Sequence, residues 1–153
     1  MKRYTKIIVM SLVLIIIGTF IYINKDNIVN KITTAENIKG CYVAHLANDV
    51  YSLKVSTQDG ENVEGTLVIK NAEKDSSSGP IKGTYKNGIL YADYTFLSEG
   101  TTSVGDVIFK KVGDGFLRGY GNTEGGVRLI DIPNVIYDSS YVYKATSSCI
   151  TSL

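Results

Sequence analysis

Three carboxylates in the middle of the chain are the side chains best suited to acid and base chemistry. Asp93, Glu99 and Asp106 lie in one short stretch, and two carboxyl groups about 5 to 9 Å apart can act as a general acid and a general base. Asp93 alternates onto the polar face of its segment, however, and Glu99 and Asp106 have the character of solvated loop or edge residues. A carboxylate-based hydrolase is therefore the least favoured of the functions considered.

Hydroxyl-bearing residues are concentrated in two polar segments that could bind a ligand. Hydroxyl groups both donate and accept hydrogen bonds, but neither segment contains the strained G-x-S-x-G turn that exposes a serine nucleophile. The candidate ligand-binding residues are Ser98, Glu99, Thr101, Thr102 and Ser103 in one segment, and Asp75, Ser76 and Ser77 in the other. The sequence predicts a binding function and no enzyme.

Residues that commonly hold metals or cofactors are few. His45 is the only histidine, whereas zinc sites use three or four protein ligands. The glycines at 113–115 and 119–121 are followed by no predicted helix, so they cannot form a phosphate-binding loop. Three of the 16 Lys and Arg residues precede residue 24, which leaves 13 of them against 15 Asp and Glu residues. We expect no metal, no cofactor and no nucleic-acid partner.

Cys41 and Cys149 are the only two cysteines, and they bracket most of the region after residue 39. Outside the cytoplasm such a pair is expected to form a disulfide. In a closed sheet the first and last strands are neighbours, so this bridge would join the ends of the region at the seam. Two free thiols in a reducing compartment are the alternative.

The first 23 residues have the composition of a membrane anchor. Residues 7–23 carry no charge, and counting from Thr5 gives 19 residues, or a helix roughly 28 Å long against a hydrocarbon core of roughly 30 Å. Lys2, Arg3 and Lys6 precede this run and place the N-terminus in the cytoplasm by the positive-inside rule. The expected organisation is a transmembrane helix at 1–23, a polar linker at 24–39 and a domain outside the cytoplasm at 40–153.

Secretion after signal cleavage is the alternative location. A signal peptide needs small residues at the −3 and −1 positions soon after its apolar run. Asn24-Lys25-Asp26-Asn27 offers none, and Thr33-Thr34-Ala35 lies far downstream of the run. Lipid attachment at Cys41 is not expected either, because the polar linker separates that cysteine from the apolar run.

Short segments of alternating apolar and polar residues fill the region from residue 40 to the C-terminus, which is typical of strands joined by tight turns. Asn87-Gly88 is the strongest turn signal, because a two-residue type I′ hairpin needs positive φ at both central positions. The predicted strands are 41–46, 50–57, 63–69, 81–85, 90–96, 104–111, 116–120 and 127–132, with a further short segment at 141–145.

Eight or nine such strands favour an all-β fold, a small up-and-down antiparallel β-barrel, in which closure removes the exposed sheet edges. Glycines at 65, 83, 105 and 119 suit a small barrel, where strands bend sharply. A two-sheet β-sandwich is the alternative, and pairing of the first and last strands would distinguish the two. In a strict meander the segments 73–79 and 98–103 emerge at the same end.

Several runs resemble a known group of proteins. They are GCYVAHL at 40–46, VEGTL at 63–67, EKDSSSGPIKGTY at 73–85, LYADYTFLSEGTTSV at 90–104 and GYG at 119–121. Together they resemble small uncharacterised envelope lipoproteins of Bacteroides- and Flavobacterium-like bacteria. The resemblance implies an envelope location and a small β domain, and it implies no catalytic residue. The lipid-attachment cysteine of that group is missing here, so a membrane helix would take over its tethering role.

A weaker resemblance points to an inhibitory role. Ser98-Glu99-Gly100 and the nearby Lys110-Lys111 are similar to segments of membrane-bound lysozyme inhibitors, although the match is too short to transfer a role. We expect a membrane-anchored β-barrel outside the cytoplasm that binds a small apolar or glycan ligand, or an envelope protein, through its mouth. A structural or inhibitory envelope protein is the alternative, which a filled interior would favour.

Overall fold

The computed structural model describes residues 13–20, 22, 36–98, 100–150 and 153. Residues 13–20 are helical, and the Thr19 hydroxyl donates to the carbonyl of Ile16 (2.9 Å) within this helix. No helix among the described residues combines the length and the apolar character needed to cross a bilayer. Much of the predicted anchor at 1–23, and the predicted linker up to residue 35, lie outside the described residues.

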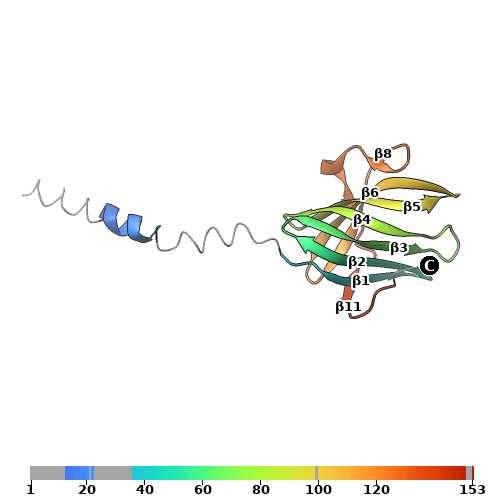
Figure 1. The fold of residues 1–153 in the computed structure, drawn as a ribbon, viewed down its shortest axis with the longest axis horizontal. Helices are drawn as coiled ribbons and strands as arrows, with labels where there is room; N and C mark the ends of the chain where they lie inside the picture. Colours follow the sequence, from blue (N-terminus) through green and yellow to red (C-terminus); the bar gives the residue numbers. More distant parts are fainter. Residues whose placement is uncertain (1–12, 21, 23–35, 99, 151–152) are drawn as a thin grey trace, which may run out of the picture. The chain divides into compact units, whose positions relative to one another are not determined.

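The rest of the described chain is all-β, as the alternation predicts (Figure 1). The strands are β1 (Gly40–Leu46), β2 (Asp49–Asp59), β3 (Asn62–Lys70), β4 (Ser77–Lys86), β5 (Ile89–Ser98), β6 (Thr101–Val112), β7 (Gly115–Tyr120), β8 (Thr123–Glu124), β9 (Arg128–Leu129), β10 (Ile136–Tyr137) and β11 (Lys144–Thr146), with a 3₁₀ turn, η1 (Ile132–Asn134). Nine of these strands form one antiparallel sheet in the order β10-β7-β6-β5-β4-β3-β2-β1-β11. The predicted meander is confirmed for β1 to β7.

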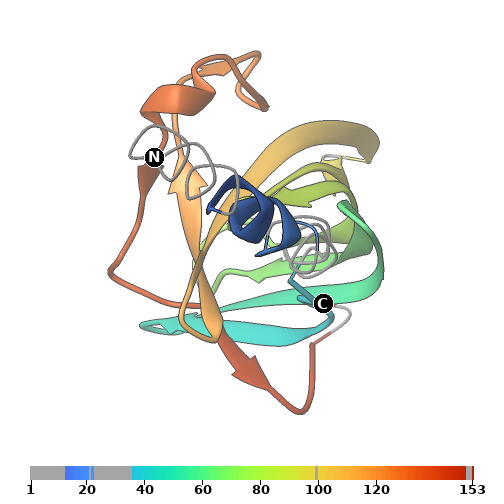
Figure 2. The ribbon, with the colours of Figure 1, turned by 90° about the vertical axis from the view of Figure 1, so that its left-hand side faces the viewer.

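The sheet curls round on itself into a partly closed barrel (Figure 2). β1 pairs with the last strand, β11, and just before β11 the backbones of Phe116 and Tyr143 exchange two hydrogen bonds of 3.0 and 2.9 Å. This bridge joins β7 to the C-terminal segment and closes the curl at one level only. The nine strands therefore form a single curled sheet instead of a two-sheet sandwich, and the expected barrel is closed only in part.

Strict alternation explains which residues face inward. In β5, Leu90, Ala92 and Tyr94 are buried, as the pattern predicts. The hairpin between β4 and β5 turns at Asn87-Gly88, where both residues have positive φ (52° and 79°), as a type I′ turn requires. This turn fixes the register of β4 with β5, in which Lys86 lies opposite Ile89.

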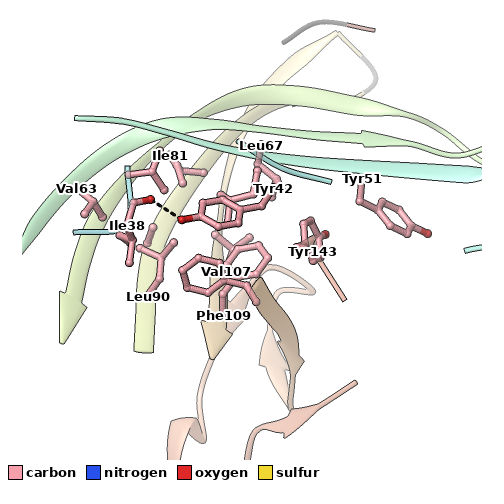
Figure 3. Close-up of a cluster of buried hydrophobic side chains, with 14 of the residues drawn as sticks. Ile38, Tyr42, Tyr51, Val63, Leu67, Ile81, Leu90, Val107, Phe109 and Tyr143 are labelled. Carbon is pink, nitrogen blue, oxygen red and sulfur yellow. Dashed lines mark hydrogen bonds between the residues drawn. The ribbon is translucent and has the colours of Figure 1, made fainter. Parts of the chain in front are cut away.

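The two ends of the curled sheet differ. We call the end with the β2–β3, β4–β5 and β6–β7 turns the closed end, and the opposite end, with the β3–β4 and β5–β6 connections, the cavity end. Ile38 is fully buried at the closed end, and its carbonyl accepts a 2.9 Å hydrogen bond from the Tyr42 hydroxyl (Figure 3). Ile38 packs there with Val63, Leu90 and other buried side chains.

The domain begins before Gly40. Gln58 accepts a hydrogen bond from the Ile38 amide (2.8 Å) and donates to the Glu36 carbonyl (2.9 Å). Glu36 in turn accepts a 2.5 Å hydrogen bond from the Tyr85 hydroxyl. Residues 36–39, which the sequence pattern assigned to the linker, thus pack as part of the domain because Ile38 completes the apolar core.

The predicted strand 127–132 is confirmed only at Arg128–Leu129 (β9), and its expected place in the main sheet is wrong. Gly125 and Gly126 both have positive φ and turn the chain within a separate two-stranded hairpin, β8–β9. The chain then passes through η1, which contains Pro133, before two residues of β10 return to pair with β7. The hairpin stands beside β6, outside the main sheet (Figure 1).

The predicted disulfide is confirmed. Cys41 and Cys149 are joined, with their Cα atoms 5.2 Å apart. Because β1 pairs with β11 in the register Cys41 to Thr146, the bridge lies at the seam between the first and last strands.

Candidate ligand-binding site

A cavity of about 240 Å³ lies at the cavity end, between the inner face of β4 to β7 and the β8–β9 hairpin. One side of this cavity is apolar, formed by Ile69, Phe96, Val107, Val127 and Leu129. β7 pairs only with the second half of β6, from Ile108 onward. The first half of β6 is therefore free of β7, and the hairpin lies alongside it.

Polar groups line the other side of the cavity, and Arg118 is the only cation among the lining residues of the described chain. Arg118 lies opposite Phe109 in the β6–β7 register. Phe109 is fully buried in the core, and opposed residues of an antiparallel pair share a face. Arg118 therefore points into the curled sheet, along with Phe116 and Tyr120 of the same strand.

Arg118 has no carboxylate partner in the part of the chain that the structure describes. Its guanidinium lies 5.3 Å from the centre of the Tyr120 ring. Burial acts to lower the pKa of Arg118, but the hydroxyls of Tyr143, Tyr120 and Tyr141 outweigh it and raise that pKa. The guanidinium is thus charged at every physiological pH.

Tyrosines surround this cation. The ring centre of Tyr141 lies 5.3 Å from that of Tyr51 and 6.0 Å from that of Tyr143, with the rings tilted toward each other. The Tyr120 and Tyr141 hydroxyls share a short hydrogen bond. Burial is the main reason why the pKa of Tyr141 and that of Tyr143 are raised. These phenols consequently stay protonated and keep an O–H to donate.

The Tyr143 hydroxyl has an unmet hydrogen-bonding capacity. It is buried and has no partner of good geometry among the described residues, although it is near enough to Arg118 for each to influence the other's pKa. The hydroxyl points toward the side of the core where Tyr51 lies, away from Ile38 (Figure 3). A buried polar group without a partner is costly, so this atom marks a place where a polar ligand atom or a water would be stabilised.

Two carboxylates of the domain, Asp49 and Asp106, are bound by donors other than Arg118. Asp49 accepts hydrogen bonds from the Tyr51 hydroxyl (3.0 Å) and the Ala72 amide (2.8 Å). Burial and the hydrogen bond to Asp49 raise the pKa of Tyr51 to about 12. Asp106 borders the cavity but pairs with Arg128 (2.6 Å). Neither carboxylate forms an ion pair with Arg118.

The β8–β9 hairpin is fastened to the sheet by one arginine and two aspartates. Arg128 contacts both Asp93 and Asp106, which face each other in the β5–β6 register. Asp106 also accepts a hydrogen bond from the Leu129 amide (2.8 Å), and the Asp106 amide donates to the Val127 carbonyl (2.8 Å). This cluster, Asp93, Asp106 and Arg128, holds one wall of the cavity.

Two larger depressions, of about 650 and 540 Å³, lie on the opposite, outer face of the sheet. Glu64 and Lys82 border both and pair with each other at 2.8 Å. These two side chains are exposed and already neutralise each other, so they offer no unpaired charge to a ligand. The smaller inner cavity is therefore the better candidate site.

The structure brings one of the sequence-predicted ligand residues to the cavity. Ser77 lines it and accepts a 2.9 Å hydrogen bond from the Tyr94 hydroxyl. Ser76 instead closes its own loop by accepting from the Asn71 amide (3.0 Å), and Asp75 is exposed.

The other predicted segment lies at the same end, as the meander requires. Thr101 and Thr102 are exposed, Ser103 is half-buried, and none of the three borders the cavity. The side chain of Ser98 and the whole of Glu99 lie outside the described part. The role of this segment in ligand binding stays a prediction.

Sequence reasoning missed Arg118, although a signal for it was present. Phe116, Arg118 and Tyr120 alternate along one strand, and a cation between two aromatic residues on an inward face is the pattern that marks a buried charge.

A comparison with protein-family models gives no match, and comparisons with curated proteins and with solved structures give none either. Function must therefore be argued from the site itself.

Proposed function

We propose that this domain is a non-enzymatic binding module that holds a small ligand in the cavity between β4 to β7 and the β8–β9 hairpin. The observation that carries the proposal is the cavity itself, with a continuous apolar wall and a polar wall built around Arg118. Sites for small molecules are concave and mostly apolar, with a few placed polar groups. A volume of about 240 Å³ is smaller than that of most drug-sized pockets, so the ligand is small.

The carboxylates do not favour a hydrolase. Burial alone would raise the pKa of Asp106, but hydrogen bonds from Arg128, the Leu129 amide and Tyr91 outweigh it and hold that pKa below its ordinary value. Asp106 is therefore a poor proton donor, and the adjacent Asp93 contacts the same arginine. Carboxylates paired in this way serve to hold the hairpin.

We further propose that the domain works outside the cytoplasm, tethered to the membrane by residues 1–23. The apolar run, the preceding basic residues and the disulfide support this location, as does the resemblance to envelope lipoproteins. Alkaline extraction of membranes tests the tether. The full-length chain should stay with the lipid, and a chain lacking residues 1–23 should be released.

Ligand-observed NMR on the full-length protein in lipid nanodiscs tests the binding function. The probes are small acids, their amides and neutral sugars, each measured with the wild type and with Val127→Trp. Val127 lies on the hairpin side of the cavity, so the indole of the variant should fill the cavity. Probes that bind the wild type should therefore give no binding signal with Val127→Trp. Ile130→Trp is the matched control, because Ile130 is on the same segment, 62% exposed and not part of the cavity wall.

Equal binding to Val127→Trp and to the wild type would place the ligand elsewhere. If no probe binds, and native mass spectrometry of protein from its own membrane finds no co-purifying molecule, the proposal fails. The structural or inhibitory role would then be the better hypothesis.

A further inference from the structure

We propose that the ligand is a small organic anion, whose acidic group pairs with Arg118 and whose apolar body lies against Phe96, Val107 and Val127. This inference rests on the proposed binding function and assigns the chemical class of its ligand.

The first reason is that the positive charge of Arg118 has no anionic partner among the described residues. A buried or half-buried cation is normally paired, because removing an unpaired charge from water is costly. Arg118 is half-buried, and none of the ion pairs of residues 36–98 and 100–150 includes it. Asp106, the one carboxylate among the described residues that border the cavity, is paired with Arg128. No acid among the described residues compensates this charge, so an anion bound in the cavity would do so.

The second reason is the set of groups around the guanidinium. Tyr120, Tyr141 and Tyr143 all lie close enough to raise the pKa of Arg118. The Tyr143 hydroxyl lies near the guanidinium, but it has no hydrogen-bond partner of good geometry among the described residues. Hydrogen bonds from a guanidinium and from phenols to an ionised acceptor are stronger than those between neutral groups. An acidic group beside Arg118 would neutralise the guanidinium charge and could accept a hydrogen bond from the Tyr143 hydroxyl.

The third reason is the shape of the remaining space. Beyond the polar wall the cavity is lined by aliphatic and aromatic side chains, among them Ile69, Phe96 and Val107. An inorganic anion would leave this wall without a partner, whereas an acid with a short aliphatic or aromatic body would bury it. The ring of Tyr94 stacks on Phe96 at 4.9 Å and extends the apolar wall toward Ser77.

Isosteric pairs of probes test this assignment on the full-length protein in nanodiscs. Hexanoate is compared with hexanamide, and benzoate with benzamide, by titration calorimetry or ligand-observed NMR. Each acid should bind at least about tenfold more tightly than its amide, since a hydrogen bond to a charged group contributes about 1.5–3 kcal/mol. Arg118→Gln should remove the preference, and Arg118→Lys should keep part of it, because it retains the charge without the planar fork.

Lys110→Gln is the matched control. It removes the same charge from the neighbouring strand β6 at an exposed position outside the cavity wall, so it should leave the preference for acids unchanged. Thermal melting of each variant checks folding. If Arg118→Gln does not fold, the acid and amide affinities of the wild type and of Arg118→Lys still decide the question.

The two proposals fail in different ways. Equal affinity for acids and amides, or an equal loss in Arg118→Gln and Lys110→Gln, overturns the anion assignment and leaves the binding function standing. Binding of sugars in preference to acids also overturns it. Absence of binding by every probe, together with no co-purifying molecule, removes both proposals.

Discussion

Single residues decide how tightly this sheet can curl. At Gly65 on β3, an ideal Cβ would lie 1.9 Å from the Lys54 carbonyl oxygen of β2, and at Gly83 on β4 it would lie 2.0 Å from that of Tyr91. Backbone atoms cannot yield as a flexible side chain can. Close approach of adjacent strands at these points therefore depends on the absence of a side chain, as expected for sharply bent strands.

Gly65→Ala should destabilise the domain by about 1–3 kcal/mol, the usual cost of forcing extra atoms into a packed site. This cost exceeds the about 0.4–1 kcal/mol gained from the stiffer unfolded chain. Gly105→Ala is the control, because its Cβ would lie 3.1 Å from the nearest atom and should cost less. Chemical denaturation measures both, and an equal cost at the two positions would contradict the explanation.

The residue scale also separates what the sequence could predict from what it could not. Alternation predicted the inward set of β5, and a closer use of it would have revealed Arg118 between Phe116 and Tyr120. The lack of an acidic partner for Arg118 among the described residues could not be predicted, because Asp106 is engaged by Arg128, 22 residues away. Long-range pairing of this kind depends on how the hairpin folds back, and periodicity carries no information about it.

At the scale of elements, the β8–β9 hairpin is a separate two-stranded sheet that is held beside the main sheet. Its alternating residues 127–132 predicted a further sheet strand, whereas Gly125 and Gly126 turn it back on itself. Arg128 forms ion pairs with Asp93 and Asp106, and Asp106 forms two further hydrogen bonds, with Leu129 and Val127, that fasten the hairpin beside β6. The alternation of residues 127–132 identified an extended segment, but tertiary contacts determined that it pairs with β8 and not with a strand of the main sheet.

Arg128→Gln should loosen the hairpin and leave the sheet intact. Hydrogen exchange of the Leu129 amide should become faster. The free energy of global unfolding should fall by about 1–3 kcal/mol, because the pair with Asp93 is exposed but the Asp106 carboxylate, which is only 4% exposed, loses a charged donor. Lys86→Gln, which removes the exposed pair with Glu61 at 3.0 Å, is the control and should leave Leu129 unaffected. Unchanged exchange at Leu129 in Arg128→Gln would show that the cluster does not hold the hairpin.

Acid should release the same hairpin. The folded-state pKa of Asp106 is lowered, so its stabilising contribution is fully present above the unfolded value of about 3.9 and is lost as pH falls through the lower folded value. NMR titration of the Leu129 amide shift should give a midpoint below about 3.9. Asp106→Asn should abolish this transition, and a midpoint at or above 3.9 would contradict the lowered pKa.

The segment before β1 belongs to the core as much as the strands do. Ile38→Ala should cost about 2–5 kcal/mol of unfolding free energy, because it removes a fully buried side chain at the closed end. Ile130→Ala is the matched control, since Ile130 is 62% exposed, and should change stability by less than about 0.5 kcal/mol. Similar costs at the two positions would place the domain boundary after residue 39.

For the whole molecule, closure depends on the C-terminal segment. β11 pairs with β1, Tyr143 bridges to Phe116, and Cys149 is bonded to Cys41. The sequence predicted the disulfide and the meeting of the chain's ends, because two cysteines bracket a series of alternating segments. It did not predict how few backbone bonds close the sheet, since the segment after β7 is irregular over most of its length.

Reduction of the disulfide should therefore weaken the seam first. The bridge closes a loop with a sequence separation of 108, for which chain entropy gives a stabilisation of up to about 4.7 kcal/mol. We expect reduction to lower the free energy of unfolding by up to this amount. Hydrogen exchange should accelerate at the Phe116 and Tyr143 amides, which form the bridge, before it does at Leu67 in the interior strand β3.

A double variant, Cys41→Ser with Cys149→Ser, is the control for side effects of the reductant. In oxidising buffer it should reproduce both the stability and the exchange pattern of the reduced wild type. If the Tyr143 amide stays as well protected as that of Leu67 after reduction, the prediction is wrong. The seam would then be held without the disulfide, by the two backbone hydrogen bonds at Phe116 and by packing of the fully buried Tyr143 ring.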